Sequence, residues 1–138
     1  MINMKIIVMI PSYNEEANIG KVIKEIKQTI DATILVINDG STDNTVKEAK
    51  KAGADIIISN KKNLGLARTF KIGLDKALEL GADIIVNTDA DFQYDQREIP
   101  RIVKPIIEEK ADIVLTDRNV KNLSHMPFGK KYGNMLST

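Results

Sequence analysis

Hydrophobic positions follow two alternating patterns along the chain. Short runs of mostly branched aliphatic residues predict buried strands at 5–10, 32–38, 56–58, 84–86 and 113–115. Between them, apolar residues recur every three or four positions, which is typical of amphipathic helices. The helical stripes are Ile19, Val22, Ile23, Ile26 and Ile30; Leu66, Phe70, Leu74, Ala77 and Leu78; and Ile99, Ile102, Val103, Ile106 and Ile107. A further short helix is predicted to end at Gly53.

This alternation predicts an α/β fold, a Rossmann-like and mostly parallel sheet with helices on both faces. Pro11 is expected to close the first strand. The polar segments that follow the strands are 11–16, 38–45, 60–65, 89–95 and 116–118. Ligands of such sheets bind beyond the carboxyl ends of the strands, where the strand order reverses. We predict the reversal between the first and fourth strands, which would bring residues 11–15 beside 89–93.

The fourth apolar run stops at two carboxylates, Asp89 and Asp91. If the chain stays extended there, both side chains point the same way and their Cα atoms lie roughly 7 Å apart. Converging carboxylates repel each other unless a cation lies between or beside them. Because Gln93 adds a neutral oxygen, the donor set favours Mg²⁺ or Mn²⁺ over zinc. The alternative is a capped turn with two solvated acids.

Composition limits the classes of function. The 138 residues match one domain, and the net charge of +1 with few aromatic residues disfavours nucleic-acid binding. The lack of cysteine excludes disulfides, zinc–thiolate sites and thiol nucleophiles. We find neither a secretory signal nor an apolar run long enough to cross a bilayer. A cytoplasmic protein is therefore expected, with peripheral contact to the membrane as a further possibility.

The segment after the first strand lacks the glycine-rich patterns that cradle phosphates. It carries Glu15 and Glu16 instead, and two acids at a helix start would repel a phosphate. A phosphorylated ligand would need neutralisation elsewhere, for which a metal at Asp91 is suited. Asp39 or Glu15 could accept hydrogen bonds from a base N–H or from ribose hydroxyls. Both are also ordinary turn and helix-start residues, so a structural role stays open.

Four motifs in order resemble those of the family 2 inverting glycosyltransferases with the glycosyltransferase A fold. They are Pro11-Ser12-Tyr13-Asn14-Glu15-Glu16, Asn38-Asp39-Gly40-Ser41-Thr42-Asp43, Asn63-Leu64-Gly65 and Asp89-Ala90-Asp91-Phe92-Gln93. The chain is similar in particular to the polyprenyl-phosphate (dolichyl-phosphate) mannosyl- and glucosyltransferases. The resemblance covers nearly the whole chain.

The resemblance implies a set of site residues. Pro11, Tyr13 and Glu15 would line the nucleobase pocket, Asp39 would hydrogen-bond the base, Asp89 would hold the ribose or base side, Asp91 with Gln93 would bind Mg²⁺ or Mn²⁺ on the diphosphate, and Arg118 would meet phosphate oxygens. Asp91 and Arg118 are thus the expected catalytic residues. Two departures stand out: Thr116-Asp117 precedes Arg118 where the family often has Gly-Ser, and Tyr94-Asp95 replaces a familiar His-Pro.

The implied activity is metal-dependent transfer of a hexose, with inversion, from a GDP- or UDP-sugar to a polyprenyl (dolichyl) phosphate. Such an acceptor is already largely ionised at neutral pH and needs no general base. We expect residues 1–118 to form the nucleotide-sugar-binding core. Residues 119–138, basic and rich in apolar side chains, would start an acceptor or membrane-proximal segment that is truncated. Donor binding is then expected to survive better than transfer.

Two alternatives belong to other classes. One is a non-catalytic nucleotide-binding module. The other is a haloacid dehalogenase-type phosphatase using Asp89 and Asp91, which is disfavoured because those enzymes carry Asp-x-Asp on the opening strand, whereas here it follows the fourth predicted strand.

Overall fold

The computed structural model describes residues 3–116. Its centre is a parallel sheet with strand order β3-β2-β1-β4. The strands are β1 (Ile6–Ser12), β2 (Thr33–Asn38), β3 (Ile56–Ser59) and β4 (Ile84–Asn87). Because β2 and β3 extend the sheet to one side of β1 while β4 lies on the other, the strand order reverses between β1 and β4, which confirms the predicted switch point.

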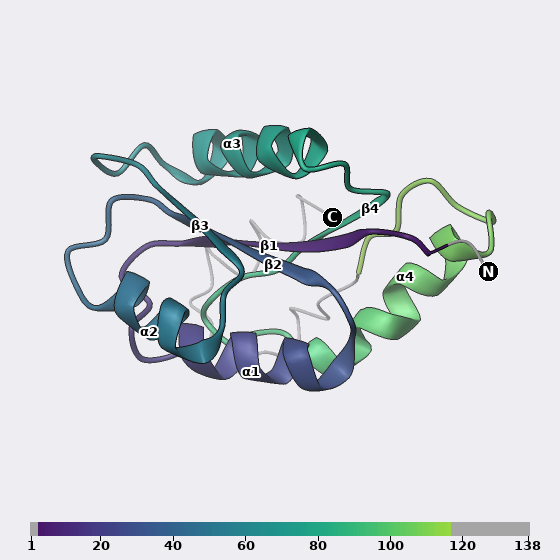
Figure 1. Ribbon diagram of the computed structural model, residues 1–138, viewed down its shortest axis with the longest axis horizontal. Helices are drawn as coiled ribbons and strands as arrows, with labels where there is room; N and C mark the ends of the chain where they lie inside the picture. Colours follow the sequence, from purple (N-terminus) through teal and green to yellow (C-terminus); the bar gives the residue numbers. More distant parts are fainter. Residues whose placement is uncertain (1–2, 117–138) are drawn as a thin grey trace, which may run out of the picture. The chain divides into compact units, whose positions relative to one another are not determined.

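Helices cover both faces of this sheet (Figure 1). They are α1 (Ile19–Thr29), α2 (Thr45–Ala52), α3 (Leu66–Glu79), the 3₁₀ turn η1 (Gln96–Glu98) and α4 (Ile99–Ile107). α3 lies over one face, and α1 with α2 lies over the other (Figure 1). One compact unit extends to Val103 and a second begins at Lys104, so α4 starts in the first unit and continues into the second.

The core lies in the two central strands. Ile7, Met9, Leu35 and Ile37 are fully buried and form one cluster with Ala77 of α3. The alternate residues of β1 and β2 are also fully buried, as expected for strands covered on both faces. α1 buries the predicted stripe of Ile19, Val22, Ile23 and Ile26. The periodicity therefore predicted both the helix and the face that packs.

α3 packs with a different face from the one its large apolar residues suggested. The residues that it buries are Thr69, Gly73 and Ala77, whereas Leu66 is 68% exposed and Leu78 is 59% exposed. Small side chains bring the helix close to the sheet: a Cβ on Gly73 would lie only 2.7 Å from Cδ1 of Ile37. The pattern thus located the helix correctly, but the requirement for close approach selected its buried face.

We expect Gly73→Ala to destabilise the fold. Overpacking against the buried Ile37 costs about 1–3 kcal/mol, and the higher helix propensity of alanine returns about 1 kcal/mol, so the net loss is about 1 kcal/mol. Gly20→Ala in α1 is the matched control, because its added Cβ would be 3.9 Å from Ala52 Cβ, an ordinary contact. Urea unfolding should show Gly20→Ala as stable as the parent or more so; a gain in both variants would contradict the tight packing of α3.

Two strand predictions were wrong. β1 does not close at Pro11 but continues to Ser12. The pairing of β1 with β4 ends at Met9 and Asn87. The backbone nitrogen of Pro11 faces the β4 side beyond this last pair, so its missing N–H costs no hydrogen bond between strands. The fifth strand predicted at 113–115 does not form within the described residues, and Ile113 and Leu115 are about three-quarters exposed (77% and 75%). A strand needs a paired neighbour, which an apolar run alone does not supply.

Candidate functional site

The segments after β1 and β2 are joined by hydrogen bonds between side chains of one and backbone amides of the other. The pairs are Asn14 N to Ser41 Oγ (3.0 Å), Thr42 N to Asn14 Oδ1 (2.9 Å), Glu15 N to Thr45 Oγ1 (2.9 Å), Glu16 N to Asp43 Oδ2 (3.2 Å) and Asn44 N to Glu16 Oε2 (3.0 Å). Asn14 has a positive φ of 50°, which lets its backbone turn into this contact. The first two sequence motifs therefore form one rigid unit at the carboxyl edge of the sheet.

Asp39 ties the loop after β3 to this unit. Its carboxylate is only 4% exposed and accepts hydrogen bonds from Asn60 Nδ2 (2.9 Å), from the amide of Leu64 (2.8 Å) and from the amide of Gly65 (2.9 Å). Burial acts to raise the pKa of Asp39, but these hydrogen bonds outweigh it and hold the pKa below the usual value. Asp39 is therefore ionised at neutral pH and orders residues 60–65.

Gly40 lets the same loop lie directly on the β2 segment. Its φ is 71°, and a Cβ at this position would be 2.5 Å from the carbonyl carbon of Lys62 and 2.7 Å from the nitrogen of Asn63. Backbone atoms cannot move aside easily, so only glycine fits here. This contact gives a physical reason for the Asp39-Gly40 pair and for its partner motif at residues 63–65.

The segment after β4 turns sharply instead of staying extended. The amide of Thr88 still bonds to the carbonyl of Met9 (3.1 Å), but the chain then turns at residues 90–92. Oδ1 of Asp91 accepts from the amide of Gln93 (3.1 Å), and Phe92 has a φ of 64°, an uncommon value for a bulky residue. The extended geometry considered for Asp89 and Asp91 is therefore wrong, and a turn presents them.

The acids of the β1 and β4 segments lie close enough to influence one another. The pKa of Glu15 is raised, chiefly by burial and next by the charge of Asp91; a hydrogen bond with Asn18 lowers it, and the charges of Asp43 and Asp89 raise it further. The pairing of Met9 with Asn87 and the bond from the Thr88 amide to Met9 place the carboxyl ends of β1 and β4 side by side, which confirms the prediction that residues 11–15 lie beside 89–93. Within residues 3–116, however, we find no group of three or more histidine or acidic side chains arranged to hold a metal ion.

Comparison with known proteins decides the family. The model of the family described as "Glycosyl transferase family 2" matches residues 7–135, nearly the whole chain. The chain belongs to glycosyl transferase family 2. The resemblance drawn from the four motifs is thereby confirmed.

Relatives of this family 2 chain include proteins named as transferases for dolichyl phosphate. It is 34% identical to the UDP-N-acetylglucosamine–dolichyl-phosphate N-acetylglucosaminyltransferase of Methanococcus voltae over 98% of the chain and 61% of that protein. It is 30% identical to the dolichol-phosphate mannosyltransferase of Pyrococcus furiosus over 93% of the chain and 38% of that protein. The chain therefore spans about three-fifths or less of these relatives.

A solved structure shows the same fold. Glucosyl-3-phosphoglycerate synthase from Mycobacterium tuberculosis, in complex with Mn²⁺, UDP and glucosyl-3-phosphoglycerate, matches with a TM-score of 0.63 and 27% identity. The match covers 75% of this chain and 40% of that one. The predicted glycosyltransferase A fold, a mostly parallel α/β sheet, is confirmed.

The structure gathers most of the predicted site residues at one edge of the sheet. Pro11 is buried at the end of β1, Tyr13 beyond it is 47% exposed, and Asp89 is half-buried after β4. Arg118 lies outside the described residues, as does the predicted segment 119–138. One residue that sequence reasoning missed is Gln96, which is 1% exposed and hydrogen-bonded to Thr88; the only signal for it was the departure from the family pattern just before it, at 94–95.

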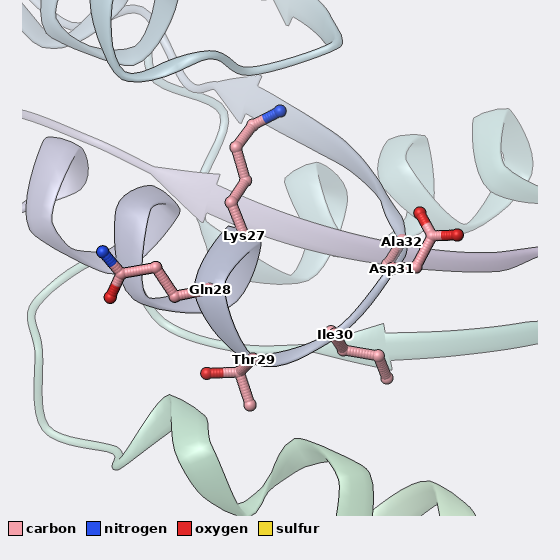
Figure 2. Close-up of a pocket in the computed structure, with 6 residues that line it drawn as sticks. All are labelled: Lys27, Gln28, Thr29, Ile30, Asp31 and Ala32. Atoms are coloured by element: carbon pink, nitrogen blue, oxygen red, sulfur yellow. The ribbon is translucent and has the colours of Figure 1, made fainter.

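A shallow hollow elsewhere on the protein contains none of the predicted site residues. Figure 2 shows it at the end of α1 and the start of β2, lined by residues 27–32. The labelled side chains of Lys27, Gln28 and Thr29 point in different directions and do not converge on a common point (Figure 2). Because it lies at the amino end of β2, it is separate from the carboxyl edge that carries the acids.

Among the described helices of this family 2 chain, none is long and apolar enough to cross a membrane.

Proposed function

We propose that this chain is the donor-binding part of an inverting glycosyltransferase that transfers a hexose from a GDP- or UDP-sugar to a polyprenyl phosphate. The observation that carries the proposal is the convergence of Glu15, Asp89 and Asp91 at the switch point of the sheet, beside the loop that Asp39 orders. The named activities of the archaeal relatives support the lipid-phosphate acceptor. A lipid acceptor would also place the protein at a membrane surface.

The nucleoside would be held through Pro11, Tyr13 and Glu15 on one side and through Asp39 and Asp89 on the other. Tyr13 offers an exposed ring on which a base could stack. A carboxylate has about four acceptor sites, and Asp39 already receives four hydrogen bonds within the protein, the fourth from the side chain of Thr69. A base N–H would therefore take the place of the Thr69 hydroxyl. In this proposal, Asp39 recognises the base and orders residues 60–65 at the same time.

Asp91 and Gln93 would hold Mg²⁺ or Mn²⁺ together with the donor diphosphate. The residues fit such an ion in their chemistry: Asp91 offers a carboxylate, Gln93 offers a neutral oxygen, and magnesium sites commonly use one or two carboxylates with substrate phosphates and water. When bound, the ion would stabilise the negative charge that develops on the departing diphosphate.

The protein's own residues would orient the reactants. An ionised phosphate oxygen of the acceptor would form the new bond to the anomeric carbon, while the bond from that carbon to the diphosphate oxygen breaks and the nucleoside diphosphate leaves with the electron pair. Attack from the opposite side inverts the anomeric centre. No proton has to be removed from the acceptor, so no general base is required. Arg118 is proposed to contact phosphate oxygens.

A thermal-shift panel of UDP- and GDP-sugars, each with and without Mn²⁺, tests donor binding. We expect one nucleotide family to stabilise the protein only with the metal, by about 2.7 kcal/mol when the ligand is at about 100 times its Kd. Transfer to a polyprenyl phosphate in detergent would then separate an enzyme from a non-catalytic nucleotide-binding module. The absence of a shift with both nucleotide families would contradict the proposal.

A further inference from the structure

Gln96 connects the two ends of the turn that carries Asp89 and Asp91. Its side chain is almost completely buried, with 1% exposed, at the start of η1. Nε2 donates to Oγ1 of Thr88 at 3.1 Å and lies 3.4 Å from the carbonyl oxygen of Tyr94. Thr88 directly precedes Asp89, and Tyr94 directly follows Gln93. One amide group therefore closes the loop that presents the proposed metal ligands.

The backbone of Gln96 is itself fixed from the other side. Its amide donates to Oε2 of Glu25 in α1 at 3.3 Å, and Nε of Arg97 lies 3.8 Å from Oε1 of the same carboxylate. Asp95 accepts from the amide of Arg97 at 3.0 Å and caps η1. The position of Gln96 is thus set by α1, the helix that packs against η1.

The side chain is poorly suited to a purely stabilising role. Oε1 of Gln96 is buried and has no hydrogen-bond partner among the described residues. A buried acceptor without a partner lowers stability, and an apolar side chain of the same length would remove that penalty. Residues that break a local rule of stability are expected where function constrains the structure.

We propose that Gln96 is a positioning residue for the turn that carries Asp89, Asp91 and Gln93. Its Nε2 holds the end of β4 to the backbone at Tyr94 and so fixes where the carboxylates point. The inference rests on the proposed function, in that the turn holds the metal and the donor diphosphate. It predicts that removing the amide lowers ligand affinity while global stability changes little.

Gln96→Met tests this prediction, with Gln28→Met on the exposed face of α1 as the matched control. UDP and GDP are each titrated calorimetrically into the chain with Mn²⁺. We expect Gln96→Met to bind the preferred nucleotide roughly fivefold to tenfold more weakly, as for a lost hydrogen bond. Its melting temperature should change little, because removal of the unpartnered Oε1 is offset by loss of the donor to the buried Thr88 hydroxyl. Gln28→Met should change neither quantity. Thr88→Val should reproduce the loss, and the double variant should lose no more than either single one.

Hydrogen exchange supplies a second readout that needs no ligand. Peptide-resolved exchange over residues 88–96 should accelerate in Gln96→Met and stay unchanged in the rest of the sheet and in Gln28→Met. If the parent binds neither nucleotide, the proposed function fails, and the exchange result still decides the positioning role. Equal affinity together with unchanged exchange in Gln96→Met would overturn the inference, as would a uniform loss of protection across the domain.

Discussion

Asp91→Asn should weaken metal-dependent binding of the nucleoside diphosphate by at least about 100-fold. Removing a group that only orients a metal ligand typically lowers metal affinity or activity 10–100-fold, and here a proposed ligand itself loses its charge. Asparagine keeps the shape and the Oδ1 that accepts from the amide of Gln93, so the turn should persist. Calorimetry with Mn²⁺ and UDP or GDP measures the change. Without metal, the same variant should also bring the pKa of Glu15 closer to normal, because the charge of Asp91 helps to raise it.

The control for Asp91→Asn is Asp75→Asn, the same chemical change on an exposed residue of α3 that pairs with Lys71. It should leave nucleotide affinity unchanged, since exposed ion pairs contribute little. NMR titration of the Glu15 carboxyl carbon provides the second measurement. Unchanged affinity in Asp91→Asn, with a normal response to Mn²⁺, would show that the metal is held elsewhere.

Asp39→Asn should destabilise the fold by about 3 kcal/mol at neutral pH. An asparagine can accept the two hydrogen bonds at Oδ1, but its amide group would then face the N–H of Gly65, leaving a buried donor without an acceptor. The hydrogen bonds to residues 60–65 would weaken. Urea unfolding at several pH values measures the effect, with Asp75→Asn again serving as the control.

The destabilisation caused by Asp39→Asn should depend on pH. The pKa of Asp39 is lowered in the folded state, so its contribution is present above the unfolded value of about 3.9 and is lost as the pH falls through the folded pKa. Asp43, whose pKa is also lowered by hydrogen bonds that outweigh burial, acts in the same direction. The stability difference between parent and Asp39→Asn should therefore shrink in acid. A difference that stays constant from pH 7 to pH 3 would contradict the role of the ionised carboxylate.

Much of the fold could be predicted because it depends on local patterns. Branched aliphatic runs alternating with amphipathic stripes predict a parallel sheet, and in such a sheet every strand delivers its carboxyl end to the same edge. The gathering of Glu15, Asp39, Asp89 and Asp91 followed from that geometry alone. The end of α2 at Gly53, which adopts φ 98°, is equally local, since glycine accepts the left-handed conformation of a helix cap.

The sequence by itself determined the order of elements, the edge that carries the acids and the resemblance to the family. Only the tertiary structure decided how those acids are held. Asp39 bonds to residues 21 to 26 positions away, α3 buries the face that Gly73 allows to approach Ile37, and Gln96 reaches back to Thr88. Periodicity reports only which neighbours a residue has along the chain, whereas hydrogen-bond partners and close packing depend on segments that folding brings together. The apolar run at 113–115 shows the same limit, because a strand exists only with a partner to pair with.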